Sequence, residues 1–511
     1  MRNQAPNRSL NYPLAAPIVK CVAKMQITST KFKSELLSEA LESLRLVVPL
    51  VITQLCDTAI NAVDVVMMGL LGTQSLAAGA LGAITFSTSL YVVYGITSGV
   101  GAMAAEAFGA GKTDQIGRVA CQGLWLVAAM SIPVMLFTCH CDSILLLLGQ
   151  EESNALLAKT YSRALVWGFP AAAGVLVLKD IASAIKQPRF VTIIMVAGLL
   201  LNVPANYVLM FGKLGFPPLG LAGIGWTSSL IFWVNFLAAS AFLAFHTNFK
   251  HYQLFRYLHQ FDRDMFVKIF QTGWPMGIHF GAEIALLNVT AWLMGYLGTV
   301  MLAAHQIAIQ TAEIFLVIPA AITCATVARV GQRLGEENPF GARISASVSI
   351  AFGAMFTFAV ALILWLFSDR LVAIYLDINN PDNTEAVKTA ISFLNLAALY
   401  QITYGIQMIA VGALLGVQDT RIPMLVNLLA FWIVGLGGSY LMGLTLGWGG
   451  IGLWWGLILG PAISAVILIW RFYFIISEKL ASLENVEDRA RTNRARTISS
   501  QPLDDAQASI S

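Results

Sequence analysis

Long apolar runs separated by short polar breaks dominate this chain. Each run is about 20 residues or longer, the length that a helix needs to cross a bilayer, and none shows the ten-residue alternation of β-barrel strands. Prolines within a run, such as Pro49 and Pro319, are tolerated because neighbouring helices satisfy the freed backbone groups. The pattern predicts an all-α polytopic membrane protein of about twelve spans, at residues 43–70, 76–108, 116–138, 158–184, 190–211, 220–245, 266–296, 300–330, 344–368, 386–416, 422–445 and 450–476.

Composition supports a membrane protein and argues against other classes. Hydrophobic residues make up 57% of the 511 and charged residues 12%, with a mean hydropathy of +0.72; the charged share is about half that of a globular protein. The net charge of +3 and the lack of a basic stripe argue against nucleic acid as a partner. Cys139 and Cys141 form the only cysteine cluster, so we expect no metal site. The enzyme motifs His-Glu-x-x-His and Gly-x-Ser-x-Gly are absent, and we expect no catalysis and no resident cofactor.

Lysine and arginine in the short loops predict the orientation, because these residues gather on the cytoplasmic side. With the N-terminus placed in the cytoplasm, the inward loops carry many of them and the outward loops few. An even number of spans then leaves both termini in the cytoplasm. The inward positions are Lys112, Arg118, Lys186, Arg189, Lys250, Arg256, Arg263, Lys268, Arg329, Arg333, Arg343 and Arg421, and the outward ones are Lys159, Lys213, Arg370 and Lys388, with Arg163 at a boundary.

The polar segments divide the chain. Residues 1–41 are predicted to be a cytoplasmic arm whose first 34 residues are basic and unstructured; a transit segment, or a true start at Met25, is the alternative. No apolar core follows the charges, so the arm is not a secretory signal. Residues 246–265 are expected to link the two halves, and residues 477–511 to form a solvated cytoplasmic tail.

The chain repeats itself at a shift of 226 residues, so each half holds six spans. Between 49–109 and 275–335, about 18 of 61 positions are identical without a gap. Six spans per half give the repeats the same orientation, related by an axis along the membrane normal. We therefore predict an N-lobe over 42–245 and a C-lobe over 266–476, facing each other across a central cavity as in secondary transporters.

Motifs in both halves resemble one known family. The second half carries Gly273-Trp-Pro-Met-Gly277, then Leu302-Ala-Ala-His-Gln-Ile-Ala308 and Arg329-Val-Gly331, and the first half carries Leu201-Asn-Val-Pro-Ala-Asn-Tyr207. In order and spacing, from about 42 to 475, they resemble the MATE multidrug exporters, and the NorM-type branch most closely. The resemblance implies a V-shaped, two-lobed fold that exports organic cations in exchange for H⁺ or Na⁺.

Asp64 in the first span is the candidate coupling residue of the N-lobe. Ionisable groups inside a bilayer are costly and are candidates for function by default. The resemblance places the family's first-lobe acid at Asp64, with Asn202 and Asn206 as hydrogen-bonding neighbours. These asparagines share one helix face, so they could hold the carboxyl or complete an oxygen shell for Na⁺. A structural polar clamp between spans one and five is the alternative.

Glu283 and Asp57 are the next candidates. Glu283 matches the family's second-lobe acid; the alternative is a glutamate bonded to backbone in a helix kink. Asp57 is its repeat partner at the shift of 226 and lies two turns before Asp64. The family usually has an uncharged residue there, so Asp57 is either an additional cavity acid or a structural acid in an ion pair.

Two positions depart from the family in the second half. Tyr404 stands where the NorM branch has an aspartate in span ten, and Glu313 stands in span eight where the family has a small or polar residue. Glu283 and Glu313 could therefore form a second-lobe pair for Na⁺, or the second lobe binds substrate only. Asp180 follows Lys179 directly, and because sequence neighbours do not face each other on a helix, we favour a structural role for it. His305 is expected to pack rather than titrate.

Together these candidates predict a monomeric secondary antiporter of the plasma (inner) membrane, or of an organelle membrane if residues 1–34 are a transit segment. Its partners are the lipid bilayer and a small cationic substrate, and its coupling ion is H⁺ or Na⁺. We favour H⁺, because Tyr404 replaces one of the two carboxylates that a second-lobe Na⁺ site uses. A flippase for lipid-linked substrates, or an organic-acid exporter of a related superfamily, is the alternative, but a basic cavity would suit those cargoes better than the acidic residues found here.

Overall fold

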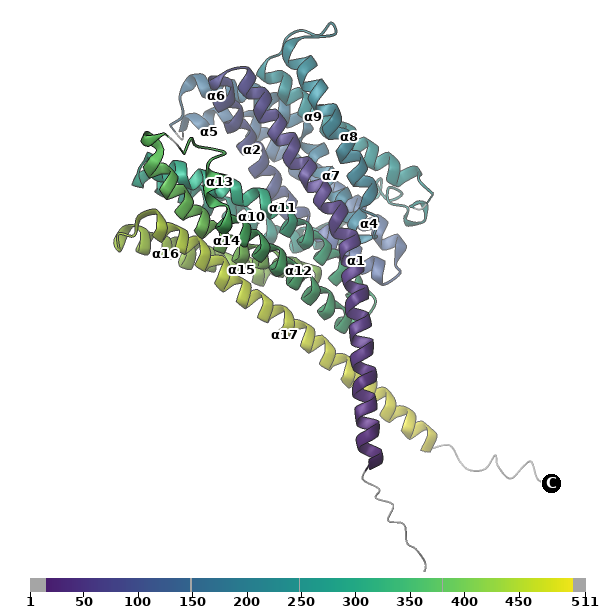
Figure 1. The fold of residues 1–511 in the computed structure, drawn as a ribbon. Helices are drawn as coiled ribbons and strands as arrows, with labels where there is room; N and C mark the ends of the chain where they lie inside the picture. Colours follow the sequence, from purple (N-terminus) through teal and green to yellow (C-terminus); the bar gives the residue numbers. More distant parts are fainter. Residues whose placement is uncertain (1–14, 148, 248, 379, 500–511) are drawn as a thin grey trace, which may run out of the picture.

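The computed structural model describes residues 15–147, 149–247, 249–378 and 380–499, and the regular structure in this part of the chain is entirely helical (Figure 1). Twelve helical segments are long and apolar enough to cross a membrane. Each predicted run overlaps one of these segments, so the prediction of about twelve spans is confirmed.

The first half of the chain contributes six spans, two of which are broken. Ser98 separates the two helices of span two, and a short 3₁₀ segment interrupts span four. The helices are α1 (Ala15–Leu70), α2 (Thr73–Thr97), α3 (Gly99–Gly109), α4 (Thr113–Cys139), α5 (Cys141–Leu147), α6 (Glu152–Leu165), η1 (Val166–Gly168), α7 (Phe169–Ala184), α8 (Arg189–Phe211) and α9 (Leu221–Phe245).

The second half contributes the other six spans after a short connection that holds η2 (Lys250–Tyr252). Its eleventh span contains two π-helical stretches, and the glycines there let the last helix approach closely, since a Cβ added to Gly456 would lie 2.3 Å from the carbonyl oxygen of Gly435. The elements are α10 (Arg263–Leu297), α11 (Thr299–Gly335), α12 (Pro339–Leu366), α13 (Ser368–Val372), η3 (Pro381–Asn383), α14 (Thr384–Gly416), α15 (Arg421–Leu428), η4 (Leu429–Leu436), α16 (Gly437–Tyr440), η5 (Leu441–Thr445) and α17 (Gly449–Ser499).

The two ends of the chain correct one prediction. The arm and the tail were expected to be unstructured, but α1 begins at Ala15 and α17 continues to Ser499. Extending an existing helix costs little, and residues 477–499 contain no Gly or Pro and are rich in good helix formers. The rest of the predicted arm and tail, 1–14 and 500–511, lies outside the described residues. Both described ends leave the same end of the molecule (Figure 1).

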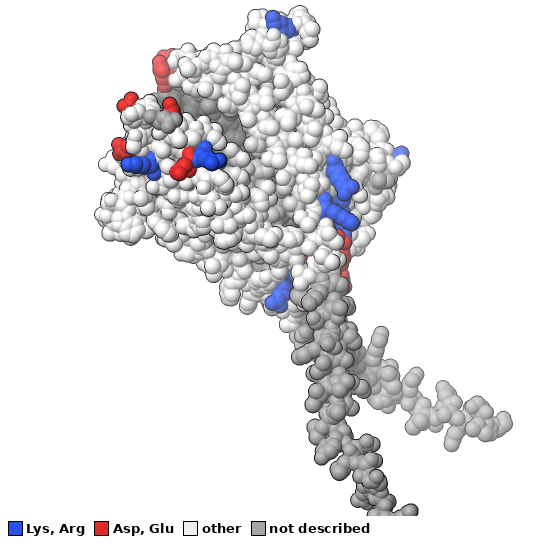
Figure 2. Space-filling view, in the orientation of Figure 1, with Lys and Arg blue, Asp and Glu red and all other residues white. Residues whose placement is uncertain are grey.

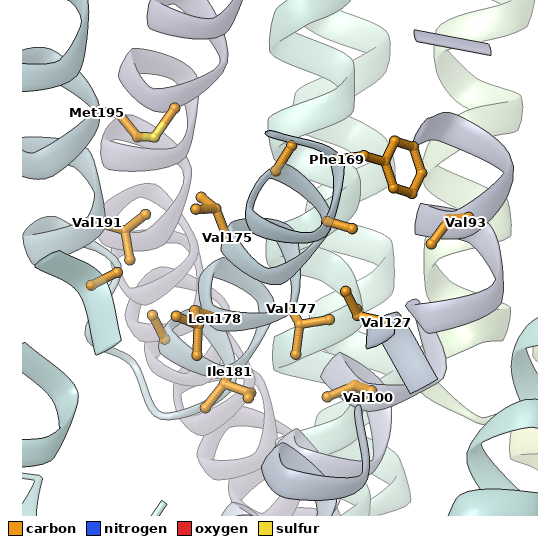
Figure 3. Close-up of a cluster of buried hydrophobic side chains, with 14 of the residues drawn as sticks. Val93, Val100, Val127, Phe169, Val175, Val177, Leu178, Ile181, Val191 and Met195 are labelled. Atoms are coloured by element: carbon orange, nitrogen blue, oxygen red, sulfur yellow. The ribbon is translucent and has the colours of Figure 1, made fainter. Parts of the chain in front are cut away.

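The core of the N-lobe is built around α7. Figure 3 shows Val175, Val177, Leu178 and Ile181 projecting from successive turns of this helix into a cluster of buried apolar side chains from its neighbours. Lipid tails are as apolar as these residues, so close packing rather than the hydrophobic effect holds them together. The cluster gives α7 a fixed position among the spans that carry the candidate site.

The two lobes meet through helix crossings that the repeat relates to each other. At one crossing, a Cβ added to Gly273 of α10 would lie 1.7 Å from the carbonyl oxygen of Ile96 on α2. The positions shifted by 226 are Val47 of α1 and Ile322 of α11, and these belong to one buried cluster. The internal repeat seen in the sequence is therefore a two-fold arrangement of the packed lobes.

A second pair of contacts follows the same rule more strictly. A Cβ added to Gly109 of α3 would lie 2.0 Å from the carbonyl oxygen of Gln332, and one added to Gly335 of α11 would lie 2.0 Å from that of Glu106. The shift of 226 converts one contact into the other. Small residues at these points let the two backbones touch.

An ion-pair cluster near the termini breaks this symmetry and joins the lobes. Glu39 of α1, which is 2% exposed, accepts two hydrogen bonds of 2.7 Å from Arg329 of α11 and one of 2.6 Å from Arg333. Ser345 of α12 donates to the same carboxylate at 2.7 Å. We call Glu39, Arg329, Arg333 and Ser345 the inter-lobe latch. The opposite end of the molecule is hollowed (Figure 2), so the latch holds the lobes together at the end that carries the termini.

Candidate functional site

Asp64 lies in a buried polar group where three N-lobe helices meet. Its side chain on α1 is 6% exposed. Oδ1 accepts from Asn206 at 2.8 Å and from Asn202 at 3.4 Å, both on α8. Oδ2 accepts from the hydroxyl of Ser228 on α9 at 2.6 Å. The structure thus brings Asp64 together with both predicted asparagines and adds a serine.

The sequence of α8 explains why its amides point inward. Asn202 and Asn206 are fully buried and share one helix face, and Asn206 also donates to Asn202 at 3.1 Å. Leu201, Val203 and Tyr207 on the other faces are exposed, as expected where a span meets lipid. A polar pair at positions i and i+4 therefore fixes the rotation of α8 about its axis.

The chemistry of this group follows from its donors. All three donors to Asp64 are uncharged, and no basic side chain within the described residues forms an ion pair with it. Three donors favour the carboxylate form, while the absence of a counter-ion leaves its charge uncompensated inside the protein. The site can therefore change between a charged and a protonated form without breaking a salt bridge.

Three further acids face a common space between the lobes. The charges of Asp57, Glu283 and Glu313 all reach the hydroxyl of Tyr91 on α2, which is 50% exposed. Asp57 and Glu283 are related by the repeat, so one acid comes from the first helix of each lobe. Glu283 and Glu313 also act on Tyr400 of α14, so both C-lobe acids face the same space.

Lys179 and Asp180 lie apart from this space, toward the packed helices of the N-lobe. Lys179 is 6% exposed and is held 5.6 Å from the ring centre of Tyr94, a cation–π contact. Asp180 packs against α3, where a Cβ added to Gly101 would lie 3.1 Å from its Cβ. The Asp57 and Asp180 charges lie within range of Lys179 and offset its charge. This placement supports the structural interpretation of Asp180.

The C-lobe acid has a partner that the sequence interpretation missed. Nε2 of His279, one turn before Glu283 on α10, lies 3.6 Å from the carboxylate Oε2. Nδ1 of His279 lies 3.2 Å from Nδ2 of Asn427 on α15. Oδ1 of Asn427 in turn accepts from Gln407 at 3.1 Å and from the hydroxyl of Ser464. We call these five residues the C-lobe polar chain; it joins α10, α14, α15 and α17.

Tyr404 lies next to this chain. It is 8% exposed and stacks on Tyr400, with ring centres 5.1 Å apart. Both tyrosines line a small cavity with Glu283, Phe431 and Pro461. The residue that replaces the expected aspartate therefore still faces Glu283, but it presents a hydroxyl rather than a carboxylate.

Different signals existed for the missed residues. His279 precedes Glu283 by four residues, a spacing that places both on one helix face, and this could have been noticed. Nothing in the local pattern singles out Ser228 or Asn427. Within the described residues, no group of three His, Cys, Asp or Glu side chains is arranged to hold a metal ion.

Comparison with known proteins extends the geometry. The sequence profile of the MatE family matches residues 49–208 and 275–441, one match in each repeat. The chain is 36% identical over 453 residues to a probable multidrug resistance protein NorM of Synechocystis sp., covering 89% of this chain and 98% of that protein. It is 38% identical over 435 residues to the probable NorM protein of Synechococcus sp., covering 85% of this chain and 94% of that protein.

Solved structures share the fold. A crystal structure of the eukaryotic MATE transporter AtDTX14 superimposes with a TM-score of 0.76 at 20% identity, covering 87% of this chain and 99% of that one. An outward-facing multidrug resistance MATE family transporter of the MOP superfamily gives a TM-score of 0.77 at 20% identity, covering 87% of this chain and 97% of that one.

Proposed function

The chain belongs to the MATE family, and from that premise we propose that it exports cationic drugs in exchange for protons carried by Asp64. The family and its NorM relatives support multidrug efflux by antiport. The flippase and organic-acid alternatives find no support among these relatives. The substrate is a small organic molecule and the protein works in a lipid bilayer, as its twelve apolar helices require.

One observation supports Asp64 as the proton carrier. Its carboxyl is buried, accepts three uncharged donors and has no ion-pair partner within the described residues. A metal ion such as Na⁺ needs several oxygen ligands, whereas the nearest groups here point N–H or O–H toward the carboxylate. A proton needs one oxygen and no shell. The site therefore suits H⁺ better than Na⁺.

The acids between the lobes supply the attraction for a cationic substrate. Asp57 and Glu283 come from equivalent helices of the two lobes, and Tyr91 lies within range of both charges. A cation bound among these groups stays in contact with both lobes when they rearrange. Release of the cation then follows when protonation removes negative charge from the cavity, which gives exchange without a separate gate.

Orientation and assembly complete the proposal. The predominance of lysine and arginine in the loops near the termini supports placing both ends in the cytoplasm of a plasma-membrane protein. The hollow in Figure 2 then faces outward. A single chain contains both lobes and the space between them, which supports a monomer as the working unit.

A transport assay with purified protein tests the coupling ion. The full chain is reconstituted into liposomes with the membrane potential clamped, and the movement of a fluorescent organic cation is followed under a pH gradient alone or a Na⁺ gradient alone. We expect the pH gradient to drive transport and the Na⁺ gradient at equal pH to give only the rate of empty liposomes. The reverse result contradicts proton coupling.

Two variants make the assay specific for Asp64. In D64N the side chain keeps its shape but cannot change charge, so we expect transport driven by the pH gradient to fall to the rate of empty liposomes. D114N, which changes an acid in the first turn of α4, is the control and should transport normally. Normal pH-driven transport by D64N at equal reconstitution removes Asp64 from the mechanism.

A further inference from the structure

The C-lobe polar chain fixes the protonation of His279. Oδ1 of Asn427 is occupied by donors from Gln407 and Ser464, so its Nδ2 must donate to whatever lies beyond it. That neighbour is Nδ1 of His279 at 3.2 Å, which therefore acts as an acceptor and carries no proton. A neutral imidazole has one N–H, and here it is left on Nε2, the nitrogen that faces Glu283 at 3.6 Å.

From this we infer that His279 is a positioning residue for the C-lobe acid: held neutral by Asn427, it directs its Nε2–H at Glu283 and reserves that carboxyl for protons and organic cations rather than Na⁺. The inference rests on the proposed function in assigning Glu283 to the cation-binding space. It adds a residue whose effect is exerted through Glu283, and a chain of three further side chains that sets its tautomer.

Burial makes this arrangement hard to reverse. His279 is 5% exposed, and Gln407 and Asn427 are each 1% exposed. An imidazolium would place N–H groups of His279 and Asn427 against each other, and relief requires Asn427 to turn its amide over and take the bond from Gln407 with it. Gln407 Oε1 has no partner within the described residues, so the reversed chain has one free acceptor but must rotate two buried amides together.

The surroundings of Glu283 contain no competing base. The titratable groups within range of its charge are Tyr91 on α2, and Tyr400 on α14, which the charge of Glu313 on α11 also reaches; Tyr404 lines the adjoining cavity. None of these carries a positive charge. His279 is therefore the group on α10 and its packed neighbours that presents a ring N–H to the carboxylate.

Selection against Na⁺ follows from the direction of this N–H. A metal ion coordinates through oxygen lone pairs and is repelled by a donor proton, and one side of Glu283 is occupied by such a donor. A proton or an alkylammonium group needs only one free carboxylate oxygen. The position where a second carboxylate would complete a Na⁺ site holds Tyr404 instead.

Carbodiimide labelling of Glu283 tests the inference without transport. Dicyclohexylcarbodiimide modifies protonated carboxyls in membranes, so the full chain in nanodiscs is labelled across a range of pH and the Glu283 peptide is quantified by mass spectrometry. In H279L the carboxylate loses its donor, and we expect half-maximal labelling to move to higher pH by about one unit. H279Q retains an amide donor and should follow the unmodified protein. H305L removes another buried histidine of the same lobe and is the matched control.

Three results would overturn the inference. The first is a labelling profile of H279L that coincides with that of the unmodified protein, and the second is an H279Q profile that moves with H279L. The third is protection of Glu283 by NaCl that choline chloride does not give, because that shows Na⁺ bound at this carboxyl.

A spectroscopic measurement keeps the test valid if H279L does not fold. The ¹⁵N spectrum of histidine-labelled protein, with the His279 signal assigned by its loss in H279Q, should show the tautomer with the proton on Nε2. N427D should convert it to a ring protonated on Nδ1, and a proton on Nδ1 in the unmodified protein contradicts the assignment. If labelling and spectrum behave as expected but no pH gradient drives transport, the proposed proton coupling fails while the role of His279 stands.

Discussion

At the scale of single residues, the N-lobe site combines one acid with donors from two other helices. Asn202 and Asn206 could be grouped with Asp64 from the sequence, but Ser228 could not, and its hydroxyl makes the shortest bond to the carboxylate, at 2.6 Å. Hydrogen bonds to charged groups contribute more than those between neutral ones. Ser228 is therefore expected to influence how readily Asp64 releases its proton.

Replacing Ser228 tests this contribution. S228A removes the donor to Oδ2 while Asn206 still holds Oδ1, and a hydrogen bond to a charged group is worth about 1.5–3 kcal/mol. We expect transport driven by a pH gradient to slow by about tenfold or more, less than the complete loss in D64N.

The adjacent serine provides the control. Ser229 donates to the carbonyl oxygens of Ala164 and Leu165 and accepts from the amide of Gly168. S229A should therefore lower the melting temperature but leave the coupled rate of the folded protein unchanged. Equal losses of coupled rate in S228A and S229A would show that the serine acts on packing alone.

At the scale of helices, the crossing of α3 and α11 depends on residues without side chains. Gly109 and Gly335 each lie against a backbone carbonyl of the other lobe, at positions that the repeat exchanges. The two glycines are marked by the internal repeat, but the sequence does not say what they touch. Their role in the structure is to let the lobes come into backbone contact.

A methyl group at this crossing should separate the helices. In G109A the new Cβ would lie 2.0 Å from the carbonyl oxygen of Gln332, and overpacking of this kind costs about 1–3 kcal/mol. We expect a lower melting temperature in detergent, measured by the loss of the monodisperse peak on heating. G69A is the control, because no atom lies within 4 Å of a Cβ added there; an equal loss in G69A would point to helix propensity instead.

At the scale of the whole molecule, the inter-lobe latch decides which end is open. Glu39 and Arg329 are almost fully buried, and breaking one partner of a buried pair costs about 3–5 kcal/mol because the other charge is left unpaired. In E39Q we therefore expect the population to shift toward a state in which the lobes separate at the end with the termini.

Cysteine accessibility reports this shift. Ala184, whose carbonyl accepts from Gln332 across the lobes at 2.8 Å, is fully buried, and a cysteine placed there should react at least about tenfold faster with a polar maleimide in E39Q. E336Q removes an acid that pairs with Arg333 but is 35% exposed, and it should leave the rate unchanged. A rate in E39Q equal to that in E336Q shows that the latch does not set the population.

Labelling in cells tests the orientation of the whole molecule. In a background without the six native cysteines, Q150C between α5 and α6 should react with an impermeant maleimide in intact cells. H259C, in the connection before α10, should react only after permeabilisation, because the basic loops lie in the cytoplasm. The opposite pattern contradicts the proposed orientation.

The sequence by itself determined the spans, the two-fold repeat and the acids that lie within the membrane. These features depend on solvation: apolar length decides whether a segment crosses a bilayer, and an acid within it is costly wherever it lies. The pairing of Asn202 with Asn206 was also determined, since a spacing of four is local to one helix. The ends were predicted less well, because helix propagation through 477–499 depends on the end of α17 from which it extends.

Only the tertiary structure decided which polar groups meet. Ser228 lies 164 residues from Asp64, Asn427 lies 148 residues from His279, and Arg329 lies 290 residues from Glu39. No periodicity links such positions, since each contact is set by how two helices rotate and cross when their apolar faces and glycines pack. The sequence therefore supplied the charged groups, and the packing of the two lobes determined whether each became a proton site, a positioned acid or part of a latch.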